Sequence, residues 1–240
     1  MSAFKDRGIV LKEEASGEYD KNLTVLLENY GKTKIFAKGA KNPKSKIGGA
    51  CALFAYSDFV IFDGGAFRSL AQAQLIDNFY NIRNDYDCFC RACFMLELSG
   101  KLIQTAPGEA LGLLVKTFGA FCKNPVNQKF VFCVYLFTLL RLEGYMPELF
   151  ACSVCRRENL DKALFFSETG LICGDCLTGK QKYFAIDNTA LSALQYIYSA
   201  ETDKLYTLNA KSDVLDILTK LALFLLEYNF EIDVKSGALL

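Results

Sequence analysis

The sequence contains no histidine and no tryptophan among its 240 residues, and it has only four prolines. Without histidine, the chain lacks the commonest general base, the usual partner of a nucleophilic serine or cysteine, and the commonest ligand of catalytic zinc. No G-x-S-x-G motif or comparable nucleophile signature is present. These absences argue against an enzyme, and we assign no catalytic residue.

Long apolar runs and targeting segments are also missing. The N-terminal stretch MSAFKDRGIVLKEE carries charges from Lys5 onward and has no apolar centre of a secretory signal. The longest apolar run, Phe130 to Leu140, is too short to cross a bilayer as a helix and predicts a buried helix. We therefore expect a cytoplasmic protein without membrane contact. In that compartment cysteines are reduced or bound to metal, not paired as disulfides.

Five segments near the N-terminus are rich in β-branched and aromatic residues and are separated by Gly, Asn, Asp and Ser. These are residues 7–15, 22–31, 32–40, 51–64 and 67–76. No long helical pattern interrupts them, so they predict a small barrel or sandwich. The five-stranded option is an OB-type barrel.

From about residue 78 the apolar residues recur three and four apart, as they do on helices. Helices are predicted within 78–104, 109–124, 127–145, 188–200 and 212–230. Pro125 is a candidate first-turn proline, while Gly144 and Pro147 should end the third helix. Asn188 and Ser212 are candidate N-caps.

Two Cys-x2-Cys pairs are separated by 17 residues, and their members are Cys152, Cys155, Cys173 and Cys176. Each pair bends the backbone so that two sulfurs converge, and a hairpin in ALFFSETGLI would bring the pairs together. Four thiolates complete a tetrahedral zinc site with no open position, which indicates a structural zinc ion. The bound site would be negative, and Arg156, Arg157 and Lys162 are near enough in sequence to offset the charge.

Two other interpretations of the cysteines are possible. CGDC resembles an oxidoreductase pair, although two such pairs without a βαβ pattern do not favour redox chemistry. Reduced cysteines without metal are the second alternative. The six remaining cysteines lie in apolar surroundings or on different faces of one helix, and we interpret them as small buried hydrophobic residues: Cys51, Cys88, Cys90, Cys93, Cys122 and Cys133.

The residues therefore predict the fold class α+β, with an N-terminal barrel or sandwich, for which an OB-fold β-barrel is the five-stranded option, followed by an α-helical domain into which a four-cysteine zinc module is inserted. We expect the barrel domain at 1–78, helical parts at 79–150 and 181–240, and the zinc module at 151–180.

The strongest charge feature is a run of six lysines without an acidic residue between Gly31 and Gly49, in a chain with 27 basic and 27 acidic residues. Within it, Gly31-Lys32-Thr33 resembles the end of a phosphate-binding loop. That motif needs a glycine five positions earlier, where this chain has Leu26. We therefore exclude nucleotide binding at this segment.

The lysines form two groups. On an extended strand Lys32, Lys34, Phe36 and Lys38 share one face, and the intervening residues share the core face. The following loop holds Lys38, Lys41, Lys44 and Lys46. Lysines that follow phosphates beside aromatics that stack bases are typical of single-stranded nucleic-acid binding. The alternative is a lysine-rich loop that only aids solubility, but ordinary surfaces mix charges of both signs.

Five segments of the sequence resemble those of a known family. The segments GIVLKEE, KNLTVLLENYGKTKIFAKGAKNPKSKIGG, LRLEGYMPELFACSVC, GLICGDC and VKSGALL together resemble RecO, the bacterial recombination mediator family. They occur in the expected order over essentially the whole chain. AKGAKNPKSK and GYMPEL followed by the first cysteine pair are the most specific of them.

The resemblance implies an OB fold, a helical domain and a four-cysteine zinc module. It implies binding of single- and double-stranded DNA, annealing of complementary strands, and location in the cytoplasm with the nucleoid. The implied protein partners are RecR and the C-terminal tail of the single-stranded-DNA-binding protein, whose recognition helps to load RecA. The family's basic segment falls on Lys38, Lys41, Lys44 and Lys46.

One departure concerns the first strand, where family members often carry basic residues after VLK and this chain has Glu13 and Glu14. Two other functions also stay open. The protein could be mainly an interaction adaptor whose helical domain binds a partner peptide, with weak DNA binding. It could instead be an OB protein that acts on RNA.

Overall fold

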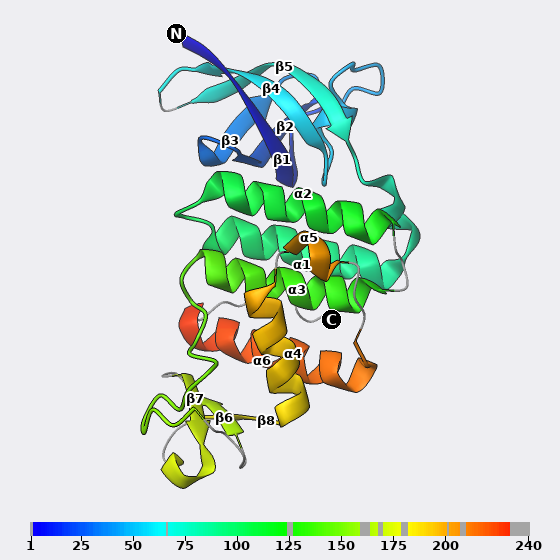
Figure 1. Ribbon diagram of the computed structural model, residues 1–240. Coiled ribbons are helices and arrows are strands. Elements are labelled where there is room, and N and C mark those ends of the chain that lie inside the picture. Colours follow the sequence, from blue (N-terminus) through cyan, green and yellow to red (C-terminus); the bar gives the residue numbers. More distant parts are fainter. Residues whose placement is uncertain are drawn as a thin grey trace. The chain divides into compact units, whose positions relative to one another are not determined.

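The computed structural model describes residues 2–65, 67–123, 127–158, 164–167, 170–178, 182–200, 202–206 and 210–230 (Figure 1). Its contacts separate two compact units, the first containing residues 1–125 and the second residues 126–233. The four-part division at residues 78, 150 and 180 stays a prediction.

The first unit begins with five strands that close in the order β1-β2-β3-β5-β4. Neighbours pair antiparallel except β3 and β5, which pair in parallel at Phe36 and Ser69. This topology confirms the predicted OB-like fold. The strands are β1 (Ser2–Ser16), β2 (Asp20–Leu27), β3 (Gly31–Ala37), β4 (Tyr56–Asp63) and β5 (Arg68–Asp77).

The barrel core is formed by inward residues that alternate with exposed ones along each strand. Val10, Val25 and Ile35 are at most 1% exposed. The fourth strand begins later than the sequence predicted, because Gly49–Cys51 form a 3-10 turn and Phe54 has a left-handed φ of 68°.

Gly8 lies where β1 passes very close to β2. A β-carbon at this position would be 2.6 Å from the carbonyl oxygen of Leu26 and 2.9 Å from side-chain atoms of Leu27 and Val25. Gly112, inside a helix, has no atom within 4 Å of the same position apart from the backbone of its own helix and its chain neighbours.

We therefore expect Gly8→Ala to lower the free energy of unfolding by about 2 kcal/mol or more, because β1 must move away from β2. Gly112→Ala should raise it by about 0.5–1 kcal/mol through helix propensity. Urea denaturation of both variants measures the difference. Equal stability of the two variants would contradict this account of the strand contact.

Two helices complete the first unit, α1 (Tyr86–Leu102) and α2 (Pro107–Lys123), after a 3-10 turn, η2 (Tyr80–Asn84). The Asp85 side chain caps α1 by accepting from the backbone N–H of Cys88 at 2.7 Å. The buried ring of Phe54 packs edge-on against Phe89 and Phe118, with centroids 5.6 Å apart in each pair. These rings join the barrel to both helices. The proposed first-turn residue Pro125 lies outside the described residues.

The second unit contains four helices and a small antiparallel sheet of order β7-β6-β8 among the described residues. Helix α3 is buried almost all round, as its sequence predicted, and Gly144, with φ 81°, follows it. The N-cap of α4 is Asp187, so the prediction of Asn188 was wrong by one residue. The elements are α3 (Gln128–Leu142), β6 (Leu164–Ser167), β7 (Gly170–Cys173), β8 (Phe184–Ile186), α4 (Asn188–Ser199), α5 (Thr202–Leu205) and α6 (Ser212–Phe230).

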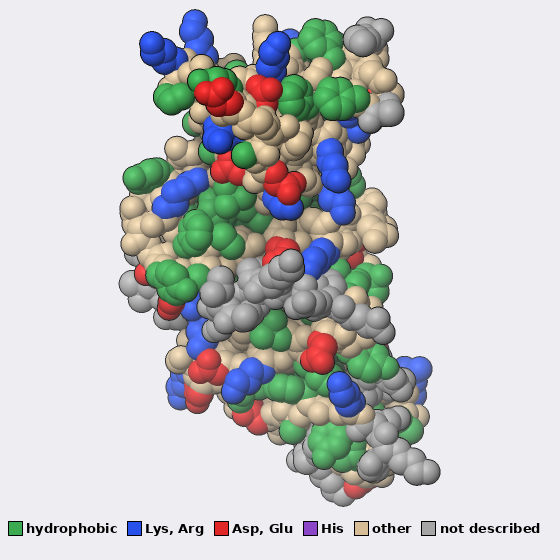
Figure 2. Space-filling view, turned by 180° about the vertical axis from the view of Figure 1, so that it is seen from behind, with side chains coloured by type: hydrophobic (Ala, Val, Ile, Leu, Met, Phe, Trp, Pro, Cys, Tyr) green, Lys and Arg blue, Asp and Glu red, His purple; other side chains and the backbone are tan. Residues whose placement is uncertain are grey.

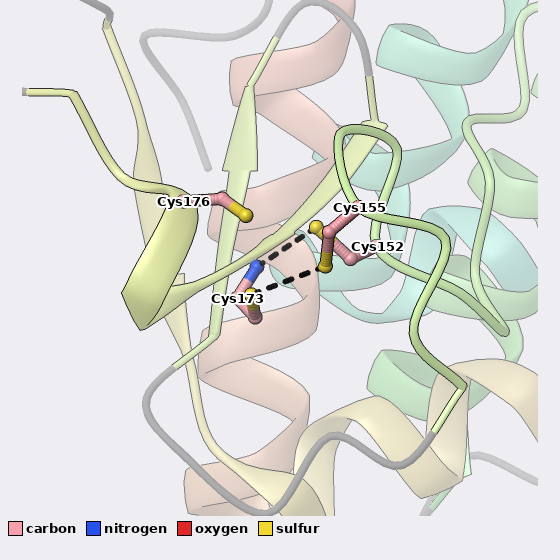
Figure 3. Close-up of side chains that lie close together, drawn as sticks. All are labelled: Cys152, Cys155, Cys173 and Cys176. Atoms are coloured by element: carbon pink, nitrogen blue, oxygen red, sulfur yellow. Dashed lines mark hydrogen bonds between the residues drawn. The ribbon is translucent and has the colours of Figure 1, made fainter.

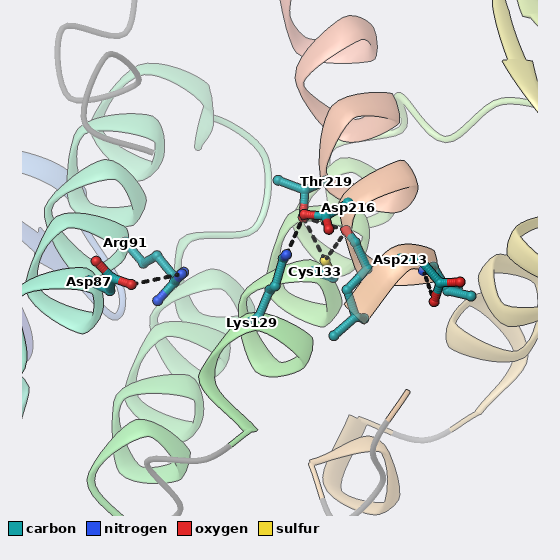
Figure 4. A network of polar contacts seen from close by, with 9 residues as sticks. Asp87, Arg91, Lys129, Cys133, Asp213, Asp216 and Thr219 are labelled. Carbon is teal, nitrogen blue, oxygen red and sulfur yellow. Dashed lines mark hydrogen bonds and ion pairs between the residues drawn. The ribbon is translucent and has the colours of Figure 1, made fainter. Parts of the chain in front are cut away.

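Polar contacts join α3 to α6 within the second unit (Figure 4). The ammonium of Lys129 pairs with the carboxylate of Asp216. One turn further along α3, the thiol of Cys133 lies 3.1 Å from the hydroxyl of Thr219. Cys133 is therefore a buried packing residue with a polar neighbour. In the part of the chain that the structure describes, no helix is both long and apolar enough to span a bilayer.

Candidate DNA-binding surface and metal centre

The third strand has the two faces that its sequence predicted. Thr33, Ile35 and Ala37 are at most 2% exposed, whereas Lys32 and Lys34 are exposed and Phe36 is half-buried. Lys38 is exposed directly after the strand. The outer face of β3 is thus basic and carries an aromatic ring.

Lys32 has a local partner that the sequence did not suggest. Its ammonium donates a hydrogen bond to the carbonyl oxygen of Gly100, in the last turn of α1. A cation is favourable there because the C-terminal end of a helix carries partial negative charge. Lys32 therefore also holds α1 against the barrel.

The basic loop after β3 is a series of hydrogen-bonded turns. The backbone N–H of Lys41 donates to the carbonyl of Tyr19 at 2.8 Å, and Gly39 N–H donates to the Asp20 carboxylate at 2.7 Å. These bonds hold the loop beside the turn between β1 and β2. Ala40 is buried below it, while the side chains of all four loop lysines are exposed. Lysine and arginine side chains project from the barrel, at the top of Figure 2.

The predicted lysines do not all lie on one edge of the barrel. Lys46 lines a hollow of about 750 Å³ on the β1, β4 and β5 side, together with Lys5, Arg7 and Gln72. Lys34 lies on the outer face of β3 and lines a different pocket. A nucleic-acid strand that contacted both Lys46 and Lys34 would have to pass around the end of the barrel that carries the basic loop.

Sequence reasoning missed an aromatic neighbour of Phe36. The Phe67 ring lies 5.7 Å from that of Phe36 and is 60% exposed, just before β5. Tyr19, in the turn beside the basic loop, is 48% exposed. The signal available in the sequence was a large aromatic residue, Phe67, placed directly between a glycine-containing turn and a strand. Phe36 and Phe67 together can offer a stacking surface to a nucleobase.

This pair gives a prediction that separates stacking from charge. Phe36→Ala and Phe67→Ala should each weaken binding of single-stranded DNA by about 5- to 150-fold, because stacking on one ring contributes about 1–3 kcal/mol. The salt dependence should stay the same, since no phosphate contact is lost. Fluorescence anisotropy at several salt concentrations measures both quantities. Unchanged affinity in both variants would remove the rings from the binding surface.

Glu13 and Glu14 of β1 are engaged by neighbouring lysines. Glu13 pairs with Lys21 and accepts from the backbone N–H of Leu53 at 3.3 Å. Glu14 pairs with Lys12 at 2.8 Å. Lys12, followed by Lys34, lowers the pKa of the Glu14 carboxyl. The two acids are therefore neutralised within the barrel surface itself.

The four predicted metal ligands converge in the second unit (Figure 3). The sulfurs of Cys152, Cys155, Cys173 and Cys176 all lie within 4.8 Å of one another. The hairpin of β6 and β7 separates the pairs as predicted, and Gly170, with φ 113°, lies at its turn. Strand β8 adds to this hairpin and was not predicted. Four close cysteines of this kind could hold a metal ion.

Backbone hydrogen bonds shape the turn that carries the first cysteine pair, Cys152 and Cys155, which we call the first knuckle. Arg156 N–H donates to the Cys152 carbonyl at 2.9 Å, and Ser153 N–H donates to the Leu171 carbonyl at 2.8 Å. The Cys173 N–H points at the Cys152 sulfur from 3.5 Å. Burial opposes ionisation, yet N–H groups of Cys155, Cys173 and Val154 lower the pKa of Cys152 to about 6.

The fourth thiol behaves in the opposite way. Hydrogen bonding to Cys173, and then to Cys155, raises the pKa of Cys176 to about 12. Four thiols in this space cannot all ionise without a cation, because their charges repel. A bound divalent ion removes that conflict, so the donor set fits a metal such as zinc.

One predicted counter-charge is in place. The Arg157 guanidinium pairs with Asp175 at 2.9 Å, and this hydrogen bond, followed by the charges of Cys155 and Asp175, raises the pKa of Arg157. Arg156 adopts a left-handed φ of 61° as the knuckle closes. Lys162 lies outside the described residues.

The six other cysteines agree with the packing interpretation in part. Cys51, Cys88, Cys90 and Cys133 are buried, whereas Cys93 and Cys122 are half-buried. Burial raises the pKa of Cys51 to about 11 and that of Cys88 to about 12. These thiols are protonated at neutral pH and are poor nucleophiles.

The fold and sites define a protein with an N-terminal OB-like barrel and a helical C-terminal region that carries a cysteine cluster able to hold a metal. The chain belongs to the RecO family: residues 1–79 match the family model "Recombination protein O N terminal", and residues 83–238 match "Recombination protein O C terminal".

Several relatives carry the name DNA repair protein RecO. The protein from Acetivibrio thermocellus is 31% identical over 92% of this chain and 90% of the relative. The protein from Clostridium acetobutylicum is 31% identical over 89% and 87%, respectively. That from Thermoanaerobacter sp. X514 is 31% identical over 98% and 96%.

Proposed function

We propose that this protein is a mediator of DNA repair and homologous recombination. It binds DNA, anneals complementary single strands and, with RecR, helps to load RecA onto DNA coated by the single-stranded-DNA-binding protein. Family membership supports the repair role. The observation that carries DNA binding is the basic, aromatic-bearing surface of the barrel, where six lysines from Lys32 to Lys46 are exposed.

The surface suits a ligand with repeated negative charges and flat rings. Lysine ammonium groups bind phosphates without reading sequence, so contacts of this kind should be independent of base sequence. The pair of Phe36 and Phe67 would stack on a base of any kind. Annealing follows from the same chemistry, because neutralised phosphates on one strand repel the complementary strand less.

The cysteine cluster holds a structural zinc ion in this proposal. Cys152, Cys155, Cys173 and Cys176 would supply four thiolates and leave no coordination position for a substrate. A bound ion would join the segment with Cys152 and Cys155 to the segment with Cys173 and Cys176, both of which belong to the second unit. The role is to stabilise this module, and no chemical step is assigned to it.

The helical region supplies the protein contacts, to RecR and to the acidic C-terminal tail of the single-stranded-DNA-binding protein. Helix α3 is almost entirely buried, so it belongs to the core and cannot itself form a peptide groove. The guanidinium of Arg141, in the last turn of α3, lies over the Tyr198 ring and donates a hydrogen bond to the carbonyl oxygen of Tyr198 at 2.7 Å. Exposed rings near it, such as Phe150 and Tyr198, are candidate contacts for an apolar side chain of a partner.

Two measurements test the proposal. Complementary oligonucleotides labelled as a fluorescence pair should anneal several-fold faster with the protein, and unlabelled RNA of the same sequence should compete poorly. RecR and a peptide with the binding protein's tail sequence should each be retained on the immobilised protein. Retention of both partners without annealing or DNA binding would favour an adaptor. Equal competition by RNA would favour an RNA-binding protein.

A further inference from the structure

A second pocket in the first unit, of about 640 Å³, lies between the outer face of the barrel and one side of α1. Lysines line it on both sides: Lys12, Lys32 and Lys34 come from the barrel strands, and Lys101 comes from the last turn of α1. Aliphatic side chains, among them Leu11, Leu53 and Leu96, also line it. It is therefore an apolar hollow that carries ammonium groups.

A β-bulge in the first strand produces this combination. The register between β1 and β2 shifts between Val10 and Lys12, so Leu11 has no partner on β2. The bulge places Leu11 and Lys12, which are neighbours in sequence, against the same pocket. Lys12 pairs with Thr24, and Thr24 pairs with Lys34, which gives a polar row across three strands.

The charges of the pocket do not balance. Glu97 pairs with Lys101 at 2.9 Å, and Glu14, outside the lining, pairs with Lys12 at 2.8 Å. Lys32 and Lys34 form no ion pair with a carboxylate among the described residues, although the charge of Lys34 also acts on Glu14. Four lysines therefore face two carboxylates, and both ion pairs are partly exposed. Exposed ion pairs contribute little free energy to stability, so a stronger anion can replace the carboxylate beside the lysine.

We propose that this pocket binds a backbone phosphate of single-stranded DNA, which adds Lys12 and Lys101 to the DNA-binding surface. The inference rests on the proposed function and deepens it. Continuity favours DNA over an acidic protein segment, because the outer face of β3 leads from Lys34 past Phe36 to Lys38 and the basic loop. The aliphatic wall would cover the sugar and keep water from the ammonium groups, which strengthens their attraction for the phosphate.

The test compares two double variants with equal charge loss. Lys12→Ala/Lys101→Ala removes the two pocket lysines that come from β1 and α1. Lys123→Ala/Lys220→Ala is the matched control, because both are exposed lysines on helices, Lys123 on α2 and Lys220 on α6. Neither control residue lines the pocket.

Binding of a fluorescent oligothymidylate is measured against salt concentration. Each phosphate contact contributes about 0.7 to the slope of log affinity against log salt for single strands. The pocket variant should lose about 0.7 of the slope, because one phosphate contact is lost, and the control should keep the slope of the unmodified protein. Lys12→Arg/Lys101→Arg should also keep it. Thermal denaturation checks that all variants are folded.

Acetylation of surface lysines, read by mass spectrometry, gives a second result. The oligonucleotide should protect Lys12, Lys34 and Lys101, while Lys123 stays reactive. If the unmodified protein binds DNA but the pocket variant has the slope of the control, the inference is overturned and the proposed function survives. If the unmodified protein shows no salt-dependent binding, both are overturned. Protection by an aspartate-rich peptide but not by the oligonucleotide would assign the pocket to a protein partner and overturn the inference.

Discussion

Replacing the four loop lysines by alanine is expected to abolish most salt-dependent binding of single-stranded DNA. Lys38, Lys41, Lys44 and Lys46 are all exposed, so four phosphate contacts would be lost. At about 0.7 per contact, the slope of log affinity against log salt should become shallower by about 3. At low salt this corresponds to a loss of affinity of more than about 100-fold. Strand annealing should slow in parallel.

The matched control replaces the same four residues by arginine, which keeps the charges. That variant should bind and anneal like the unmodified protein. Stability should change little in either variant, because the loop is held by backbone hydrogen bonds and by buried Ala40, not by the lysine side chains. A quadruple alanine variant that binds and anneals normally would mean that the loop is a solubilising segment.

Replacing Cys152 by serine is expected to remove the metal from the cluster. The unmodified protein should contain about one zinc ion per chain, since four thiolates fill one tetrahedral site. Structural zinc contributes on the order of 10 kcal/mol to small isolated modules. The loss should loosen the β6–β7 hairpin and expose it to protease. Elemental analysis and limited proteolysis measure both effects.

The barrel should survive that change. Cys152 belongs to the second unit and the barrel to the first, so the variant should retain DNA binding through the barrel. Cys122→Ser is the control, because Cys122 is half-buried and is not part of the cluster. Full zinc content in the Cys152 variant would contradict the assignment of this ligand.

The sequence predicted the barrel because each strand carries its own signal. Alternation along Lys32 to Ala37 separates core residues from outer ones, and the structure confirms this separation. The bulge at Leu11 could not be predicted in this way, because it depends on how β1 pairs with β2. Strand β8 was also missed, because its three residues carry too short a pattern to be recognised.

The candidate sites show the same limit. The cysteine ligands could be identified because fixed spacing within each pair and one hairpin between pairs are local features. The contact between Lys32 and Gly100 joins residues 68 positions apart, and no local pattern encodes it. Phe67 reaches Phe36 through the parallel pairing of β3 and β5, which also depends on the closed barrel. Contacts that depend on closure of the barrel therefore needed the structure.

The most direct test of DNA binding by the basic surface is a salt titration of the unmodified protein with single-stranded DNA. Affinity is measured by anisotropy from low to physiological salt with oligonucleotides of different base sequence. Four loop contacts predict a slope of about −3, or steeper if the pocket beside α1 also binds a phosphate. All sequences should give similar affinities. A slope near zero, or binding that depends on one base sequence, would contradict this account.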